Sequence, residues 1–284
     1  MRIKKIAVVG CGTMGSGIVQ LAAQNGFEVV GVETDDDIAA RARARIAAGI
    51  DCTLSRGRIT AEQAREAPGL YRLSTDLGAI AEADLVVEAV YEDVELKKRL
   101  LGEIDRLVGP RTLIASNTST IPLVVLAAAT SRPGRIVGLH FFNPVSAMRM
   151  VEVIRTPVTE TGPLEAVTEL AESLGKSPVV VDDVAGFVGN PLIVPYLLDA
   201  VRAYERGVAD MKSISAVIEL GFDHKMGPQA LSDLIGLDIV HDMAASLYEE
   251  YKDPRYHPPG LLKQYVRLGW LGRKTGRGFY RYAH

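Results

Sequence analysis

Residues 6–15 read IAVVGCGTMG, a short apolar run that leads into three glycines. The apolar run predicts a buried strand, and the residues after it have helical spacing, so the glycines lie at a strand-to-helix turn. Glycines in this G-x-G-x-x-G context permit a tight turn, let the backbone approach a pyrophosphate and place the phosphates at the helix N-terminus. A plain strand–helix connection could have the same glycines. The sequence therefore predicts a dinucleotide site at Gly10, Gly12, Thr13, Met14 and Gly15.

Glu33 lies at the end of the second predicted strand. A carboxylate there can accept hydrogen bonds from the adenosine ribose hydroxyls and repels a 2′-phosphate, which favours NAD over NADP. The cations Arg41, Arg43 and Arg45 follow in the chain and keep NADP as the alternative. A solvated strand end is the simpler interpretation of Glu33 taken alone.

Apolar runs alternate with helical patterns from Lys5 to Val181, which predicts a doubly wound, mostly parallel sheet of the α/β class. The expected strands are Ile6–Gly10, Val29–Glu33, Leu70–Ser74, Leu85–Ala89, Thr112–Ser116, Ile136–His140, Met150–Ile154 and Pro178–Val181. The expected helices are Met14–Asn25, Asp36–Leu54, Val94–Val108 and Pro163–Leu174.

The pattern changes after Gly186, where apolar residues recur at helical spacing with no strand between them. This predicts a second, all-helical domain. The boundary is expected within Asp182–Gly189, which gives a dinucleotide-binding domain over residues 1–185 and a helical substrate or dimerisation domain over residues 186–284.

Composition limits the classes of partner. The chain is 48% hydrophobic and 24% charged with a net charge of −3, which is typical of a soluble globular protein. No basic track suggests a nucleic acid, and no long uninterrupted apolar stretch suggests a membrane. The two cysteines form no CxxC and the five histidines lack ligand spacing, so we expect no metal and a cytoplasmic chain.

His140 ends the sixth expected strand, at the sheet edge where α/β proteins bind ligands. Histidine can take and return a proton near neutrality, as the oxidation of an alcohol requires. Glu152 lies among apolar residues on the next strand, where a neighbouring strand could place it against the other imidazole nitrogen. Taken singly, His140 could be a core histidine and Glu152 a surface charge; together with the nucleotide fold they predict a catalytic pair.

Several segments in order carry a family resemblance: GCGTMGSGI, EAVYEDVELK, ASNTST, HFFNPV, MVEVI, GFVGN, MGPQALSDLIGLD and GRKTGRGFY. The chain resembles the 3-hydroxyacyl-CoA dehydrogenases, especially the short bacterial 3-hydroxybutyryl-CoA type. The resemblance implies hydride transfer between NAD(H) and C3 of an (S)-3-hydroxyacyl-CoA thioester. It makes His140 the general base and Glu152 its partner, and it places Ser119 and Asn190 at the substrate oxygen. A loop cap at Ser119 and a helix cap at Asn190 are the structural alternatives.

The resemblance also assigns supporting residues. Glu92 and Lys97 match contacts of the dinucleotide, and Asn117 and Asn143 match polar residues that line the cleft. Without the resemblance, Glu92 would be a helix start and Lys97 a surface charge. Arg56 could pair with a phosphate of the CoA.

Three further expectations concern partners. The resemblance implies a homodimer built through the helical domain. A carrier-protein-bound or free 3-hydroxyacid is the alternative substrate. A nucleotide-binding protein without catalysis is the alternative from another class.

Overall fold

The computed structural model describes residues 3–282, which divide into two compact units, residues 3–184 and residues 185–282. The division lies between Val184 and Ala185. Each unit has its own hydrophobic core.

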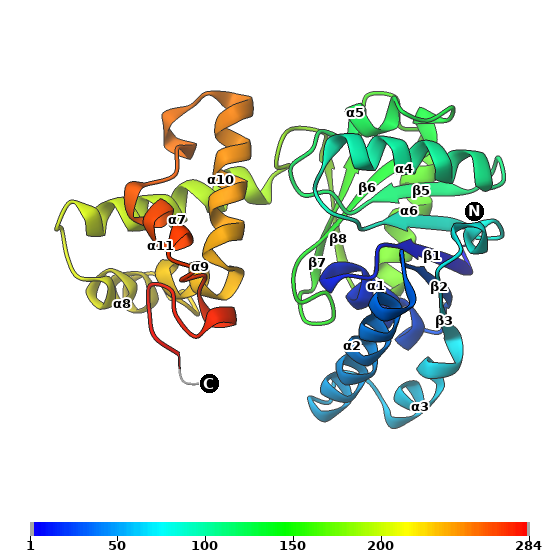
Figure 1. Cartoon of the computed structure of the whole chain (residues 1–284), viewed down its shortest axis with the longest axis horizontal. Coiled ribbons are helices and arrows are strands. Elements are labelled where there is room, and N and C mark those ends of the chain that lie inside the picture. The colour runs from blue at the N-terminus through cyan, green and yellow to red at the C-terminus, as the bar shows by residue number, and fades with distance from the viewer. Residues whose placement is uncertain (1–2, 283–284) are drawn as a thin grey trace. The chain divides into compact units, whose positions relative to one another are not determined.

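The first unit is built on an eight-stranded sheet of order β3-β2-β1-β4-β5-β6-β7-β8 (Figure 1). The strands are β1 (Lys5–Val9), β2 (Glu28–Val32), β3 (Tyr71–Ser74), β4 (Leu85–Glu88), β5 (Leu113–Ser116), β6 (Ile136–Phe141), β7 (Met150–Arg155) and β8 (Ser177–Asp182). The first six run parallel in the order of a doubly wound dinucleotide-binding fold. The next strand, β7, is antiparallel to β6 and parallel to β8. The predicted fold class is confirmed, and the expected strands differ from these by no more than one residue at either end.

The helices of the first unit are α1 (Thr13–Gln24), α2 (Asp36–Ser55), α3 (Ala61–Leu70), α4 (Val94–Leu107), α5 (Leu123–Ala127) and α6 (Thr161–Ser173). Two of them, α3 and α5, were not predicted. Helix α3 buries only Ala67, so it has no apolar stripe that would reveal it. Its sequence signal is a capping box, in which Thr60 and Gln63 each accept a hydrogen bond from the other's backbone N–H.

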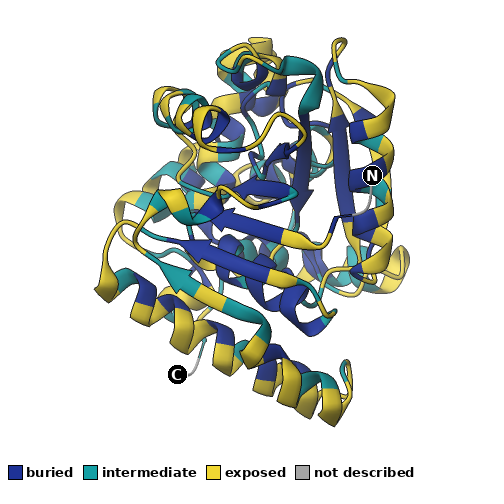
Figure 2. Cartoon of the chain, turned by 90° about the vertical axis from the view of Figure 1, so that its right-hand side faces the viewer, coloured by how far each residue is buried: buried dark blue, intermediate teal, exposed yellow. Residues whose placement is uncertain are grey.

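The central strands are buried along almost their whole length because helices cover both faces of the sheet. Figure 2 shows these strands in dark blue and the outer faces of the helices in yellow. Such burial explains why the strands appear in the sequence as near-continuous apolar runs.

The second unit is all-helical, as predicted, with α7 (Gly189–Glu205), α8 (Met211–Gly221), α9 (Pro228–Ile235), α10 (Leu237–Tyr251) and α11 (Gly260–Arg267). Its core joins Leu197 and Leu198 of α7 to Val240 and Leu247 of α10. The C-terminal segment is fastened by the buried Asp233 carboxylate. This carboxylate accepts hydrogen bonds from Phe279 N (2.8 Å), Tyr280 N (2.9 Å) and the Tyr282 hydroxyl (2.9 Å).

None of the helices within residues 3–282 combines the length and the apolar character needed to cross a bilayer. Over the same residues, no group of three or more His, Cys, Asp or Glu side chains could hold a metal ion.

Candidate active site

The glycine turn joins β1 to α1. Gly10 has φ +88°, and a Cβ there would lie 2.9 Å from the backbone nitrogen of Val90. A Cβ on Gly15 would lie 1.8 Å from the carbonyl oxygen of Gly10, so both positions require glycine. A Cβ on Gly12 would meet nothing within 4 Å. This open position adjoins the first turn of α1, which begins at Thr13, contains no acidic residue and has backbone N–H groups without helical partners. The turn therefore fits an anionic diphosphate.

Glu33 follows β2 and lies against this turn. Its Oε1 accepts a short hydrogen bond from the backbone N–H of Cys11, and its Oε2 accepts one from Thr34 N at 3.3 Å. Arg45 of α2 donates to the Cys11 carbonyl and to the Ser16 hydroxyl, both at 3.2 Å. One carboxylate and one guanidinium therefore flank the turn, and only the carboxylate was singled out from the sequence as a cofactor residue.

His140 and Glu152 are brought together by the antiparallel pairing of β6 with β7. They are cross-strand partners, and His140 Nδ1 lies 2.7 Å from Glu152 Oε2. Gly138 is opposite Ile154 in the same register. A Cβ at position 138 would lie 2.6 Å from the Ile154 Cβ, so glycine at this position leaves room for the Ile154 side chain. Both members of the pair are buried, with exposed fractions of 6% for His140 and 1% for Glu152.

The chemistry of this pair follows from hydrogen-bond roles. An ionised carboxylate can only accept a hydrogen bond, so the imidazole donates from Nδ1 and has its lone pair on Nε2. His140 lies near the carboxyl end of β6, and the Phe142 ring centroid is 4.7 Å from that of the imidazole. The arrangement orients the imidazole near the carboxyl edge of the sheet, which is the edge where α/β folds generally bind ligands.

Lys97 is fully buried in α4, which makes the surface-charge interpretation wrong. Its ammonium lies 2.6 Å from Glu88 Oε1, 3.2 Å from the Val90 carbonyl and 3.4 Å from Glu92 Oε2. Glu92 does not begin the helix either, because Asp93 is the N-cap of α4 and accepts from Leu96 N.

Glu92 binds the loop that follows β5. Its Oε1 accepts hydrogen bonds from the Thr118 hydroxyl at 2.7 Å, from Ser119 N at 2.8 Å and from Thr120 N at 2.9 Å. Burial tends to raise the pKa of Glu92, but the Lys97 ammonium, the Thr118 hydroxyl and the N–H groups of Ser119 and Thr120 together outweigh burial and hold the pKa below its ordinary value. Ser119 is half-buried in this loop. The Glu92 carboxylate that holds the loop therefore stays ionised.

The remaining predicted residues of the first unit lie in different settings. The Asn117 side chain accepts from Phe141 N at 3.0 Å and so links the ends of β5 and β6. Asn143 is exposed in the β6–β7 loop, and Arg56 is exposed at the C-cap of α2. A Cβ at Gly49, about two helical turns before Arg56, would lie 2.1 Å from Gln20 Oε1.

Asn190 belongs to the second unit and is 5% exposed. It lies inside the first turn of α7, where Val188 is the N-cap, and its N–H donates to the Gly186 carbonyl at 3.2 Å. The helix-cap alternative for Asn190 is therefore wrong.

Lys176 is a buried cation that sequence reasoning missed. Its ammonium donates to the carbonyls of Val145 at 2.5 Å and Met148 at 2.8 Å, in the loop that follows His140. Burial, and secondarily Arg58, lowers its pKa to about 8. A lone lysine at a strand start gives no sequence signal for such burial.

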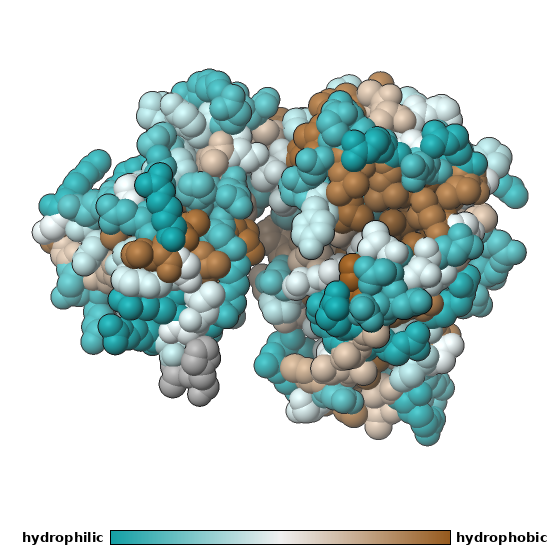
Figure 3. Space-filling view, in the orientation of Figure 1, coloured by the Kyte–Doolittle hydropathy of each residue, from teal (hydrophilic) through white to brown (hydrophobic). Residues whose placement is uncertain are grey.

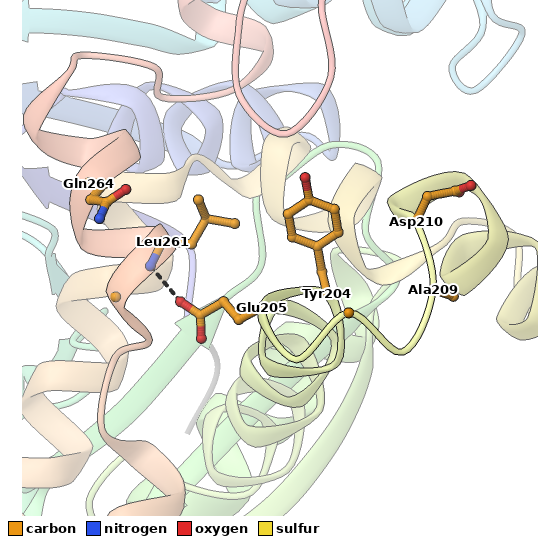
Figure 4. Close-up of a pocket in the computed structure, with 8 residues that line it drawn as sticks. Tyr204, Glu205, Ala209, Asp210, Leu261 and Gln264 are labelled. Carbon is orange, nitrogen blue, oxygen red and sulfur yellow. Dashed lines mark hydrogen bonds between the residues drawn. The ribbon is translucent and has the colours of Figure 1, made fainter.

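The second unit also has a hollow of about 630 Å³ between the end of α7 and the start of α11 (Figure 4). The residues that line it include Tyr204, Glu205, Asp210, Leu261 and Gln264. The Glu205 carboxylate accepts from Leu261 N at 2.6 Å, so it serves the start of α11. No predicted site residue lines this hollow, and it offers no paired acid and base.

Comparison with known proteins identifies relatives of both units. Residues 5–184 match the NAD-binding domain of 3-hydroxyacyl-CoA dehydrogenase, and residues 186–282 match the C-terminal domain of the same family. A 3-hydroxybutyryl-CoA dehydrogenase of Mycobacterium tuberculosis is 43% identical over 282 residues, which cover 99% of each chain. The crystal structure of M. tuberculosis FadB2 superposes with a TM-score of 0.97 at 43% identity over 100% of both chains. That of the (S)-3-hydroxybutyryl-CoA dehydrogenase of Ralstonia eutropha gives 0.93 at 39% identity over 99% of this chain and 100% of the other. The chain belongs to the 3-hydroxyacyl-CoA dehydrogenase family.

Proposed function

We propose that the chain is an NAD-dependent dehydrogenase that interconverts an (S)-3-hydroxyacyl-CoA and the 3-oxoacyl-CoA, with a short acyl chain such as 3-hydroxybutyryl. The observation that carries this proposal is the buried His140–Glu152 pair, 2.7 Å apart, in a chain of this family. The named activities of the mycobacterial and Ralstonia relatives support the short-chain substrate.

In the proposed reaction, His140 Nε2 removes the proton of the 3-hydroxyl group, and the Glu152 carboxylate stabilises the imidazolium that forms. Ser119 donates a hydrogen bond to the 3-oxygen, which has most need of a donor as charge develops on it. On the resemblance alone, we propose the same of Asn190. When bound, NAD supplies the acceptor for the hydrogen and electron pair that leave C3.

The glycine turn and Glu33 are the proposed cofactor site. The positive end of α1 and the N–H groups of Thr13 and Met14 suit the pyrophosphate. The Glu33 carboxylate suits the ribose hydroxyls of NAD and repels the 2′-phosphate of NADP. Arg56, at the end of α2, remains the proposed partner of a CoA phosphate.

The test follows the absorbance of NADH or NADPH while acetoacetyl-CoA is supplied. We expect oxidation of NADH that is lost in His140→Gln and kept in the control His241→Gln, whose histidine is on α10 and outside the proposed machinery. Acetoacetate and an acetoacetyl carrier-protein thioester are tested in parallel. Turnover on either of these but not on the CoA thioester would contradict the substrate, and a fully active His140→Gln would contradict the mechanism.

We also propose a homodimer formed through the second unit. This unit exposes several large apolar side chains on and beside α8: Val208 (72%), Val217 (61%), Leu220 (87%) and Phe222 (67%). In the view of Figure 3 this unit has a small area of brown, hydrophobic residues among mostly hydrophilic ones. Apolar surface of this kind is typical of an interface between protein chains. Analytical sedimentation compares the molecular mass of Leu220→Lys with that of the parent, and we expect the mass of a dimer for the parent and a lower mass for the variant. Equal masses for the two proteins, or a monomeric parent, would refute the proposal.

A cytoplasmic location is part of the proposal. Cys52 is an exposed free thiol on α2, and Cys11 is a buried one. Free thiols are typical of proteins kept in a reducing compartment. Fractionation of cells that express the chain tests the location.

A further inference from the structure

The loop between β6 and β7 is held from below by a buried ammonium group. Lys176 lies just before β8 and is 8% exposed. Its ammonium donates to the carbonyls of Val145 at 2.5 Å and Met148 at 2.8 Å. The next residue, Ser177, donates its backbone N–H to the Arg149 carbonyl at 2.8 Å. Two consecutive residues therefore fasten three carbonyl groups of the loop to the start of β8.

The same loop packs against α1, the helix that follows the glycine turn. Val145 is 3% exposed, and its Cβ and Cγ2 would each lie 2.9 Å from a Cβ at Gly17. Glycine at position 17 therefore leaves a notch on α1 that the Val145 side chain fills. Gly17 is two residues after Gly15, which belongs to the glycine turn. The loop is thus held between the first turns of α1 and the start of β8.

Asn143 lies in this loop, two residues before Val145. Two residues of chain span at most roughly 7 Å, so the contact of Val145 with α1 keeps Asn143 near the beginning of that helix. The strands from β1 through β4 and β5 to β6 are parallel, so the glycine turn and the start of the loop lie at the same carboxyl edge of the sheet. Asn143 is exposed, so its amide is accessible to a ligand at this edge.

We propose that Lys176 is a positioning residue for the cofactor: by holding the β6–β7 loop against α1, it sets Asn143 where the amide can bind the dinucleotide. The inference rests on the proposed function, because it needs NAD at the glycine turn and Asn143 in contact with it. Lys176 acts through the backbone of the loop and needs no contact of its own with NAD.

The expected effect follows from the hydrogen bonds. Lys176→Met removes the ammonium and keeps an unbranched apolar side chain in the same place. The carbonyls of Val145 and Met148 then lose their donor, and the loop is held less firmly. A hydrogen bond of ordinary strength changes an affinity by about two- to tenfold. Misplacement of the Asn143 amide should therefore raise the dissociation constant of NADH at least about threefold.

The experiment is a double-mutant cycle of Lys176→Met with Asn143→Ala, read as the dissociation constant of NADH from fluorescence titration. We expect Lys176→Met to cost at least about threefold in the parent and less than about 1.5-fold when Asn143 is already alanine, because both changes remove one contact. Lys5→Met is the matched control. It removes a lysine ammonium that pairs with Glu82 at the opposite, amino end of β1, and it should leave NADH affinity unchanged.

Amide hydrogen exchange without added NADH gives a readout that does not depend on the cofactor. The N–H groups of Ala147 and Met148 both donate to the Pro144 carbonyl inside the loop, at 2.9 and 3.0 Å. Their exchange should accelerate in Lys176→Met and keep the parental rate in Lys5→Met. Val145→Ala loosens the contact with α1 while Lys176 stays intact, so it should have the same effects on exchange and on NADH affinity. It replaces Lys176→Met in both measurements if that variant does not fold.

Four results would overturn the proposal. Unchanged exchange would show that Lys176 does not hold the loop, and faster exchange with unchanged NADH affinity would show that the loop does not position a cofactor contact. An equal loss of affinity with and without Asn143 would show that Lys176 acts by another route. An Asn143→Ala variant that binds NADH like the parent would exclude Asn143 as the contact. If the parent does not bind NADH, the proposed function fails, whereas the exchange result still decides whether Lys176 holds the loop.

Discussion

The substitution Glu152→Gln tests how much the Glu152 charge contributes to the action of His140, the proposed base. The substitution keeps the size of a side chain that is 1% exposed and lies 2.7 Å from the His140 ring nitrogen. The change removes the anion that stabilises the imidazolium in the transition state. For charges about 4 Å apart at the effective dielectric constant of protein sites, the attraction is about 4 kcal/mol. The amide dipole replaces part of it, so we expect kcat to fall about 10²- to 10³-fold.

The assay compares single-turnover rates, NADH affinity and thermal melting of Glu152→Gln with those of the parent. We expect NADH affinity to be unchanged, because Glu152 serves the base and lies away from the glycine turn in the sheet order. Glu165→Gln, at an exposed position of α6, controls for loss of a carboxylate as such. A folded Glu152→Gln that retains a rate within about threefold of the parent would refute the role of the pair.

Three further changes test the cofactor site, the buried lysine and the C-terminal anchor. In binding titrations, Glu33→Ala should reduce the ratio of NADH affinity to NADPH affinity at least about tenfold, since the repulsion of the 2′-phosphate is lost. An unchanged affinity ratio would show that Glu33 does not determine the cofactor preference. The pKa of Lys176 is lowered from 10.5 to about 8, so between these values the unfolded chain binds more protons and the free energy of unfolding rises with pH. Lys176→Met should abolish this rise when the free energy of unfolding is measured by urea titration at several pH values. If the free energy of unfolding of the variant rises with pH as steeply as that of the parent, the rise does not come from Lys176. Asp233→Asn should lower the free energy of unfolding by about 1–3 kcal/mol, because an amide cannot accept all three hydrogen bonds of the C-terminal segment; calorimetry that shows no loss would argue against the anchor.

The glycine turn and the positions of the strands could be predicted because they depend on local signals. Buried parallel strands have continuous apolar sequences, and Gly10 and Gly15 are required by contacts within a few residues or with the adjacent strand. The antiparallel direction of β7 was not predicted from those signals. A connection as short as the one between β6 and β7 contains no helix, and parallel strands need a crossover of a dozen or more residues. That rule gives the direction of β7, whereas the register that pairs Glu152 with His140 comes from the structure.

The environment of Lys97 and Lys176 could not be read in the same way. Lysine is almost never fully buried unless its charge has a partner, and the partners here come from other elements: Glu88 of β4 for one, and the carbonyls of the β6–β7 loop for the other. Only the folded sheet brings those groups together. Local pattern therefore located the elements, whereas the network behind Ser119 depends on contacts between them.

The cross-strand placement of His140 and Glu152 also limits how the chain can change by insertion. In a sheet, adding one residue inside β6 or β7 would turn every following side chain to the opposite face, and one member of the pair would leave its partner. An added residue in the loop between the strands leaves their alignment intact. Length variation among descendants of this chain should therefore be tolerated at the tip of that hairpin and eliminated within its two arms.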